Sequence, residues 1–187
     1  MENNKIRIEA GFILQLILCL MTLPVRITFS WLAASAIHEL GHLLCLMLLR
    51  KQIAMISVGL SGARIYAQSL EPWQEVLVAV SGPVAGLVPL LFFRHIPVIA
   101  LFGAVQSFCN MIPIYPMDGG RVFIRILHWI CGEQIADKIY GIMVFILRLA
   151  LLILALIVTI RYSLGLWLII GLLFWVFRIK LSCKEGR

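Results

Sequence analysis

The sequence predicts an all-α polytopic membrane protein with about six transmembrane helices and one short β-hairpin. Hydrophobic residues make up 62% of the 187 residues and charged residues only 13%, and the mean hydropathy is +1.02. A soluble domain usually carries about 25% charged residues, and a disordered chain has low hydrophobicity. The composition therefore excludes both classes, and lipid is the expected solvent for most of the chain.

Six apolar runs approach the length of about 20 residues with which a helix crosses a bilayer. They lie near residues 8–25, 27–49, 73–93, 96–114, 139–160 and 162–179, separated by charged residues, prolines or glycines. Lys5 and Arg7 precede the first run, as in a signal peptide, but no cleavage site of small residues follows it. We therefore expect a retained first helix and a single integral membrane domain over residues 1–187.

The basic residues predict the orientation, because short loops rich in Lys and Arg stay on the cytoplasmic side. With the N-terminus inside, the inner segments hold Lys5, Arg7, Arg50, Lys51, Arg64, Arg121, Arg125, Lys138, Arg178, Lys180, Lys184 and Arg187, and the outer segments hold Arg26, Arg94 and Arg161. This bias predicts that both termini lie in the cytoplasm. The expected location is a bacterial cell membrane. The net charge of +7 is scattered rather than clustered, so no nucleic-acid partner is expected.

The second span contains a five-residue segment, His38-Glu39-Leu40-Gly41-His42, in which three side chains are ionisable. Two histidines at i and i+4 share one helix face, so both imidazoles can reach a single Zn²⁺. Glu39 lies about 100° further around the helix and can accept a proton from water at the metal. The alternative is that these groups only join helices by hydrogen bonds. Because ionisable groups cost several kcal/mol each within hydrocarbon, a metal or catalytic site is the favoured interpretation.

A hydrolytic zinc site usually takes a third protein ligand. The other Asp and His residues are Asp118, Asp137, His95 and His128. The expected topology places Asp118 on the same side of the membrane as the two motif histidines and His95 on the opposite side. Pro113 and Pro116 break the helix before Asp118, and irregular backbone at membrane depth lines a cavity. Asp118 is therefore the preferred candidate, and His128 is not expected to be a ligand.

Together these residues resemble the site-2 protease family of intramembrane zinc metalloproteases. That family pairs H-E-x-x-H on one transmembrane helix with an Asn, Pro and Asp-Gly motif on a later one. The matching residues here are His38-Glu39-x-x-His42, Asn110-x5-Pro116-x-Asp118-Gly119 and, similar to the family's small-Gly-Pro motif, Ser81-Gly82-Pro83. The resemblance covers the core, residues 27–131. It implies that His38, His42 and Asp118 bind zinc, that Glu39 is the general base, and that Asn110 contributes to substrate or oxyanion binding.

The resemblance also implies a function: hydrolysis of peptide bonds within or near transmembrane segments of membrane-bound substrates, with one Zn²⁺ per chain. A regulatory membrane protein is a possible further partner. Because the segments between and after the spans are short, no PDZ domain and no CBS domain are expected. The sequence resembles a minimal form most similar to the sporulation branch, without that branch's usual C-terminal domain. The competing interpretation is a non-catalytic metal-binding scaffold or a transporter. A transporter would show repeated halves with polar groups on several spans, and no repeat is evident.

Residues 53–67 predict a β-hairpin that turns near Ser61-Gly62, because Ile56, Val58 and Leu60 alternate. An exposed edge strand could pair with an extended substrate, since a helical substrate hides its carbonyls in hydrogen bonds. The alternative is a simple loop that links two spans.

Three weaker features carry structural expectations. The small residues at 81–86 are expected to allow close helix contact, and the segment after Gly120 to form an interfacial amphipathic helix. Arg148 is expected to reach the membrane surface or to pair with Asp137, with substrate contact as the alternative. The five cysteines form no Cys-x-x-Cys pair and are expected to be structural.

Overall fold

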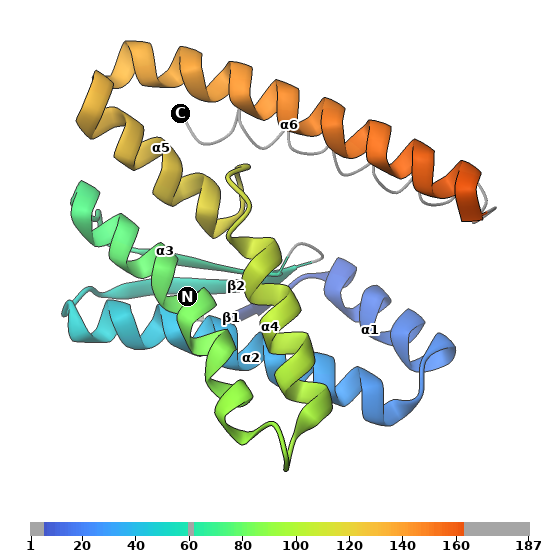
Figure 1. Cartoon of the computed structure of the whole chain (residues 1–187). Helices are drawn as coiled ribbons and strands as arrows, with labels where there is room; N and C mark the ends of the chain where they lie inside the picture. The colour runs from blue at the N-terminus through green and yellow to red at the C-terminus, as the bar shows by residue number, and fades with distance from the viewer. Residues whose placement is uncertain (1–5, 60–61, 163–187) are drawn as a thin grey trace. The chain divides into compact units, whose positions relative to one another are not determined.

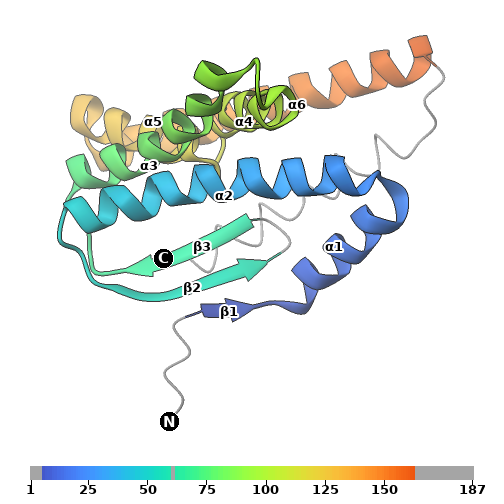
Figure 2. The same ribbon diagram turned by 90° about the horizontal axis from the view of Figure 1, so that it is seen from below.

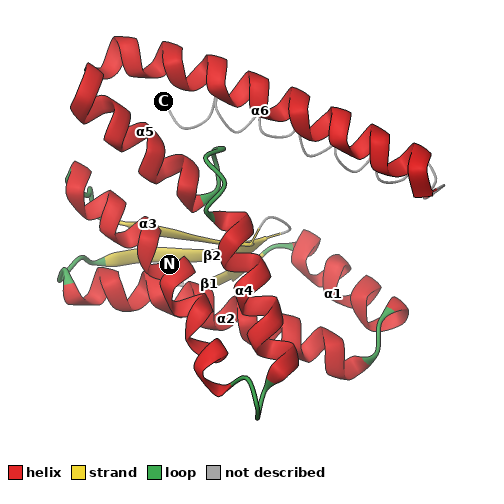
Figure 3. Cartoon of the chain, viewed as in Figure 1, coloured by secondary structure: helices red, strands yellow, loops and turns green. Residues whose placement is uncertain are grey.

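The computed structural model describes residues 6–59 and 62–162. The chain divides into two compact units, Met1–Ile112 and Pro113–Arg187, which contain the helices and strands of Figure 1 and Figure 3. The sixth expected span, at 162–179, lies almost entirely outside the described residues, as do the two residues at the tip of the predicted hairpin. The organisation of residues 1–187 as one domain stays a prediction.

The described residues of the first unit form four α-helices. They are α1 (Ala10–Thr22), α2 (Val25–Leu48), α3 (Pro72–Leu87) and α4 (Pro97–Asn110), and a short 3-10 helix, η1 (Val88–Phe92), continues from α3. Val25–Leu48 and Pro72–Phe92 are long and apolar enough to cross a membrane, whereas α1 and α4 are shorter apolar helices at the positions of the first and fourth expected spans. A helix of 13 residues rises only about 20 Å, less than the hydrocarbon thickness of about 30 Å.

Local signals set the ends of these helices. Pro24 separates α1 from α2, as its position in the sequence predicts. At the start of α3, the side chain of Glu71 accepts from the backbone of Gln74, and the side chain of Gln74 accepts from the Glu71 backbone N–H. This reciprocal pair satisfies two amide groups that a helix N-terminus otherwise leaves without a partner. At the end of α2, Arg50 has a φ of 55°, the left-handed conformation that often ends a helix.

Small residues bring α2, α3 and α4 into close contact. A methyl group on Gly41 of α2 would overlap the backbone oxygen of Ser81 and lie 2.6 Å from the Cβ of Ala85, both in α3. A methyl group on Gly103 of α4 would overlap the backbone oxygen of Gly86. Because lipid supplies no hydrophobic drive between helices, such close backbone approach stabilises a membrane bundle. The predicted packing role of the 81–86 stretch is confirmed.

A three-stranded sheet lies along one side of α2 (Figure 2). Its strands, in the order β1-β2-β3, are β1 (Ile6–Ile8), β2 (Ile53–Gly59) and β3 (Gly62–Ala67). The antiparallel pairing of β2 with β3, in which Ile56 faces Ile65, confirms the predicted hairpin. Ile53 and Ile65 pack against a cluster formed by Cys45 and Leu46 of α2 and Val78 of α3. The sheet is therefore fixed to the two helices that carry the H-E-x-x-H and Ser-Gly-Pro motifs.

The N-terminal strand was not predicted. The first apolar run was expected to be helical from about residue 8, but β1 pairs in parallel with β2 before α1 begins. Glu9 explains the arrangement: its backbone N–H donates to Val58 (2.9 Å), and its carboxylate accepts from the hydroxyl of Ser57 (2.8 Å). A methyl group on Gly59 would contact this carboxylate. These contacts arise from residues about 50 positions away, so the local apolar pattern could not show them.

The second unit contains α5 (Asp118–Cys131) and α6 (Glu133–Tyr162), separated by Gly132. Residues 133–161 are long and apolar enough to cross a membrane. The α5 helix begins at Asp118, two residues earlier than Gly120. The half-buried rings of Phe123 and Tyr140 lie with their centroids 6.4 Å apart. The basic and apolar faces expected for α5 are present, since Arg121 is exposed on one side and Ile130 on the other.

The expected pairing of Arg148 with Asp137 is wrong. Asp137 instead accepts from the ring nitrogen Nε2 of His128 at 3.0 Å. Arg148 lies eleven residues beyond Asp137 on the same helix, a rise of about 16 Å, and its Nε atom is buried with no hydrogen-bond partner among the described residues. The four described cysteines, Cys19, Cys45, Cys109 and Cys131, are free, as expected.

We predict that Gly103→Ala destabilises the first unit by about 1–3 kcal/mol, because the added methyl group forces α4 away from Gly86. Thermal unfolding of the purified chain in detergent, followed by circular dichroism, measures the effect. The matched control is Gly141→Ala in α6, where no described atom lies within 4 Å of the new methyl group. An equal midpoint for Gly103→Ala and the unmodified chain would contradict the packing described here.

Candidate metal centre

The two motif histidines lie one turn apart on the buried face of α2. His38 is 2% exposed and His42 is 7% exposed, and their rings meet edge to face with centroids 5.0 Å apart. The helix holds both side chains toward α3 because Gly41, between them in sequence, allows α3 to approach closely. The predicted pairing of these two side chains on one helix face is therefore present.

A backbone carbonyl of α3 fixes the orientation of the second ring. The Nδ1 atom of His42 lies 2.7 Å from the carbonyl oxygen of Val78. A carbonyl can only accept, so Nδ1 must donate, and in the neutral ring Nε2 then carries the lone pair. Histidines that bind metals usually donate their other ring N–H to a carbonyl or carboxylate in this way. His42 is therefore held in the tautomer that a metal ligand needs.

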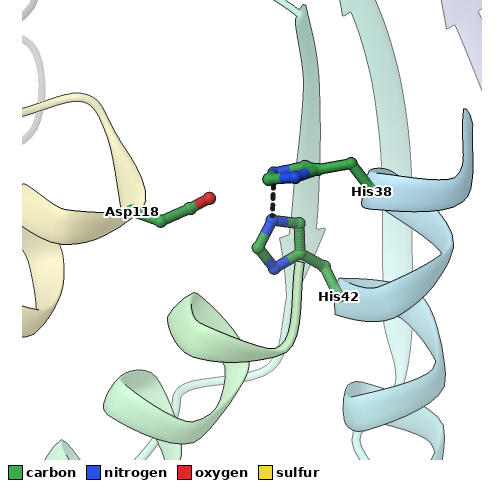
Figure 4. Close-up of side chains that lie close together, drawn as sticks. All are labelled: His38, His42 and Asp118. Carbon is green, nitrogen blue, oxygen red and sulfur yellow. Dashed lines mark hydrogen bonds between the residues drawn. The ribbon is translucent and has the colours of Figure 1, made fainter. Parts of the chain in front are cut away.

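The separation of the two Nε2 atoms suits a shared metal ion. They lie 3.3 Å apart, as the dashed line in Figure 4 marks. Two nitrogens that each bind a tetrahedral zinc ion at about 2.05 Å are roughly 3.3 Å from one another. Because the lone pair of His42 Nε2 points into this space, either a proton on His38 or a cation must lie between the rings. The observed distance fits both cases.

Gly82 of α3 borders the same space. A methyl group built on Gly82 would overlap the Nε2 and Cε1 atoms of His42 and lie 2.9 Å from the Nε2 atom of His38. Any larger residue would therefore collide with the His42 ring and crowd the His38 ring unless the rings moved. The sequence marked Gly82 as part of a small-residue packing stretch, but its position here gives it a second consequence, because it keeps the space beside the rings open.

Asn110 and Glu39 approach this pair from other directions. The side-chain amide nitrogen of Asn110, the last residue of α4, is 3.4 Å from the Nε2 atom of His38. Glu39 is half-buried on α2, and a methyl group built on Gly62 at the start of β3 would lie 3.8 Å from its Oε1 atom. A polar amide thus lies beside the ring nitrogens, and the Glu39 carboxylate lies beside the edge strand of the sheet.

Asp118 is the first residue of α5 and is 7% exposed. Asp118, in the second unit, belongs with His38 and His42 to a group of side chains that could hold a metal ion (Figure 4). Two imidazole nitrogens and a carboxylate oxygen form a donor set typical of zinc sites that keep one position open. The described residues therefore fit a divalent zinc ion.

Two contributors were missed from the sequence. The carbonyl of Val78 carries no side-chain signal, because any residue has one, and only the close contact of α3 with α2 brings it to His42. Gly82 stood in a recognisable motif, but its role beside the ring nitrogens depends on the register of the two helices. The candidate ligand side chains were thus visible in the sequence, whereas the carbonyl and the glycine that support the two histidines were not.

We predict that Gly82→Ala lowers the metal content of the purified chain by at least about tenfold, because the methyl group would displace the His42 ring from its position beside His38. Metal analysis by mass spectrometry after mild chelation and reloading with zinc measures this. Gly141→Ala serves as the control, since it makes the same chemical change far from any described contact. Full zinc occupancy in a folded Gly82→Ala variant would show that the ion binds elsewhere.

Comparison with known proteins gives an independent view of this arrangement. No protein-family model matches the chain. A curated protein of Synechocystis sp., named "Putative zinc metalloprotease sll0528", is 34% identical over 125 residues, which are 58% of this chain and 33% of the relative. The chain thus spans about a third of the length of that relative.

A solved structure matches along the whole chain. The site-2 protease from Methanocaldococcus jannaschii superposes with a TM-score of 0.68 and 23% sequence identity, over 100% of this chain and 93% of that protein. At this identity the match concerns the fold. The chain therefore adopts the fold of a site-2 protease, and the resemblance to that family indicated by its two motifs is confirmed by these comparisons.

Proposed function

We propose that this chain is an intramembrane zinc metalloprotease that hydrolyses peptide bonds within or near transmembrane segments of membrane-bound proteins. The observation that carries the proposal is the pair of Nε2 atoms 3.3 Å apart, with His42 oriented by the Val78 carbonyl. The names of the curated relative and of the solved structure support the same activity class. The apolar helices support a membrane setting.

In this proposal His38, His42 and Asp118 are the zinc ligands. The chemistry of their donor atoms and the close approach of the two histidine Nε2 atoms support the assignment. When bound, the zinc ion would lower the pKa of a water molecule and polarise the scissile carbonyl. The histidines contribute neutral nitrogens and Asp118 a negative charge, so the ligand set reduces the charge of the ion without cancelling it.

Glu39 is the proposed general base. It follows the first ligand directly, so the helix holds its carboxylate about 100° around from that ligand and one residue further along. The carboxylate would accept the proton of the attacking water and then pass it to the nitrogen of the leaving amine. No side chain becomes covalently attached to the substrate, so this route needs no serine or cysteine nucleophile.

Asn110 is proposed to hold the carbonyl oxygen of the scissile bond. Its amide lies beside the Nε2 atom of His38, and an ion bound by that nitrogen would leave the amide hydrogens without their acceptor. They could then donate to an oxygen that gains negative charge during the attack. A preorganised donor of this kind typically contributes a factor of about 100 to 1,000 in rate.

The free edge of β3 is the proposed docking strand for the substrate. Within the described residues, β3 pairs with β2 on one side only, and its first residue, Gly62, lies next to Glu39. An unwound substrate segment that adds to this edge by backbone hydrogen bonds would present its peptide bonds in extended form. The substrate is proposed to enter from the lipid, and water is proposed to reach the site from the cytoplasmic side. The proposed setting is a bacterial cell membrane with both termini in the cytoplasm.

The competing function is that of a metal-binding scaffold or transporter without hydrolytic activity. Such a protein would retain the zinc ligands but would not require a base beside them. A regulatory membrane protein that controls access to the site is compatible with either function. The role of Glu39 therefore separates the two candidates.

We predict that Glu39→Gln retains zinc but lowers cleavage of transmembrane reporter substrates by at least about 100-fold, because the amide cannot accept the proton. Zinc content and cleavage are measured on the same preparation reconstituted in lipid. The matched control is Leu40→Ala, the next residue on α2, which is 51% exposed on the opposite side from the histidines and is expected to leave both readouts unchanged. Cleavage that persists in Glu39→Gln would refute the base assignment, and a wild-type chain that binds zinc but cleaves none of a broad reporter panel would favour the scaffold.

We also predict that Asp118→Ala weakens zinc binding by about 10- to 100-fold, because one of three protein ligands is removed. Competition with a fluorescent chelator gives the zinc affinity without any need for turnover. Asp137→Ala is the control, since this carboxylate pairs with His128 instead. Unchanged affinity in Asp118→Ala would exclude Asp118 as a ligand.

A further inference from the structure

The docking strand proposed above, β3, carries an exposed arginine, Arg64. Arg64 lies at the third position of β3 and is exposed. Among the described residues it makes no ion pair. Its neighbours at the first and fifth positions of the strand, Gly62 and Tyr66, are also exposed, whereas the residues between them are half-buried against the rest of the unit. Arg64 is thus the charged side chain on the outward face of the edge strand.

The distance of Arg64 from Glu39 follows from strand geometry. Gly62 lies next to the Glu39 carboxylate, and a strand rises about 3.3 Å per residue. Arg64 therefore lies about 7 Å further along the strand than the residue beside the base. Because successive side chains alternate between the two faces of a sheet, a substrate residue opposite Arg64 is two positions from the substrate residue opposite Gly62.

We propose that Arg64 is a specificity-determining residue that selects an acidic side chain in the substrate, two positions from the residue that faces Gly62. The inference deepens the proposed function and rests on it. A guanidinium group offers paired N–H donors that match a carboxylate. Opposite charges on directly facing residues of adjacent strands stabilise the pairing, whereas like charges destabilise it. Substrates with Asp or Glu at this position are then preferred over those with Lys or Arg.

The sheet supplies a matched control for this proposal. Arg7 on β1 pairs with Ser57 on β2, and Ser57 pairs with Arg64 on β3, so the two arginines stand in one cross-strand row at opposite edges of the sheet. Both are exposed. A general attraction of the positively charged sheet for acidic peptides would depend on both residues, whereas selection by the β3 edge depends on Arg64.

Binding to the Glu39→Gln variant tests the proposal without turnover. The probes are three fluorescein-labelled peptides rich in Val and Thr that differ at one central position, which is Glu, Gln or Lys. Fluorescence anisotropy with the zinc-loaded full chain in phosphatidylcholine nanodiscs gives each dissociation constant. We expect the Glu peptide to bind about two- to fivefold more tightly than the Gln peptide, with the Lys peptide weakest.

The variants then locate the preference. Arg64→Glu should reverse the order of the Glu and Lys peptides, Arg64→Lys should keep it, and Arg7→Glu should leave it unchanged. Equal binding of the three peptides, absence of binding by all of them, or an equal effect of Arg7→Glu and Arg64→Glu would overturn the proposal. An equal effect of Arg7→Glu and Arg64→Glu would indicate that the arginines act through the overall charge of the sheet, for example by protecting its edges from aggregation.

Cleavage assays keep this proposal distinct from the proposed function. In wild-type protein, a transmembrane reporter library randomised beside the membrane should yield cleaved products enriched in Asp or Glu at one position, and Arg64→Glu should shift that enrichment to Lys or Arg. Cleavage without such enrichment would support the protease function and refute the role of Arg64. Charge-selective peptide binding without any cleavage would support selection at the β3 edge and refute hydrolysis.

Discussion

The close contact of α3 with α2 is the constraint on which the metal centre depends. It brings the carbonyl of Val78 to the His42 ring and Gly82 to the space beside the two Nε2 atoms. Within lipid such contact relies on small residues rather than on the hydrophobic effect. The same packed pair of helices supports the sheet, since Ile53 and Ile65 pack against Cys45, Leu46 and Val78. One helix interface thus positions His38 and His42, orients the His42 ring and anchors the strand that borders Glu39.

Much of the fold and of the site could be predicted from the sequence because the informative residues are chemically unusual in an apolar chain. His38, Glu39 and His42 share a short helical motif, so their relation depends only on helix geometry. The hairpin was visible in the alternation of Ile56 and Val58 and in the Gly-containing turn. Asp118 could be proposed as a third ligand because the chain has few other Asp and His residues and because prolines interrupt the helix before it.

The features that could not be predicted depend on contacts between distant segments. The strand β1 forms because Glu9 meets Ser57 and Gly59 across the sheet, whereas the local sequence alone favoured a continuous apolar helix. The pairing of Asp137 with His128 follows from the turn at Gly132, which brings the end of α5 near the start of α6. Charge complementarity alone had suggested Arg148 as the partner. In each case helix or strand propensity was overridden by tertiary geometry.

The position of Gly41 has a consequence for sequence variation in this motif. The pattern H-E-x-x-H allows any residue at two positions, which are Leu40 and Gly41 here, but only position 41 is restricted by contact with α3. Leu40 points outward and is compatible with any side chain that lipid tolerates, whereas position 41 is limited to a residue without a side chain because Ser81 and Ala85 lie against it. The working pattern is therefore His-Glu-apolar-Gly-His. A library randomised at position 41 alone would lose most of its members through separation of α2 from α3, although both motif histidines would still be encoded.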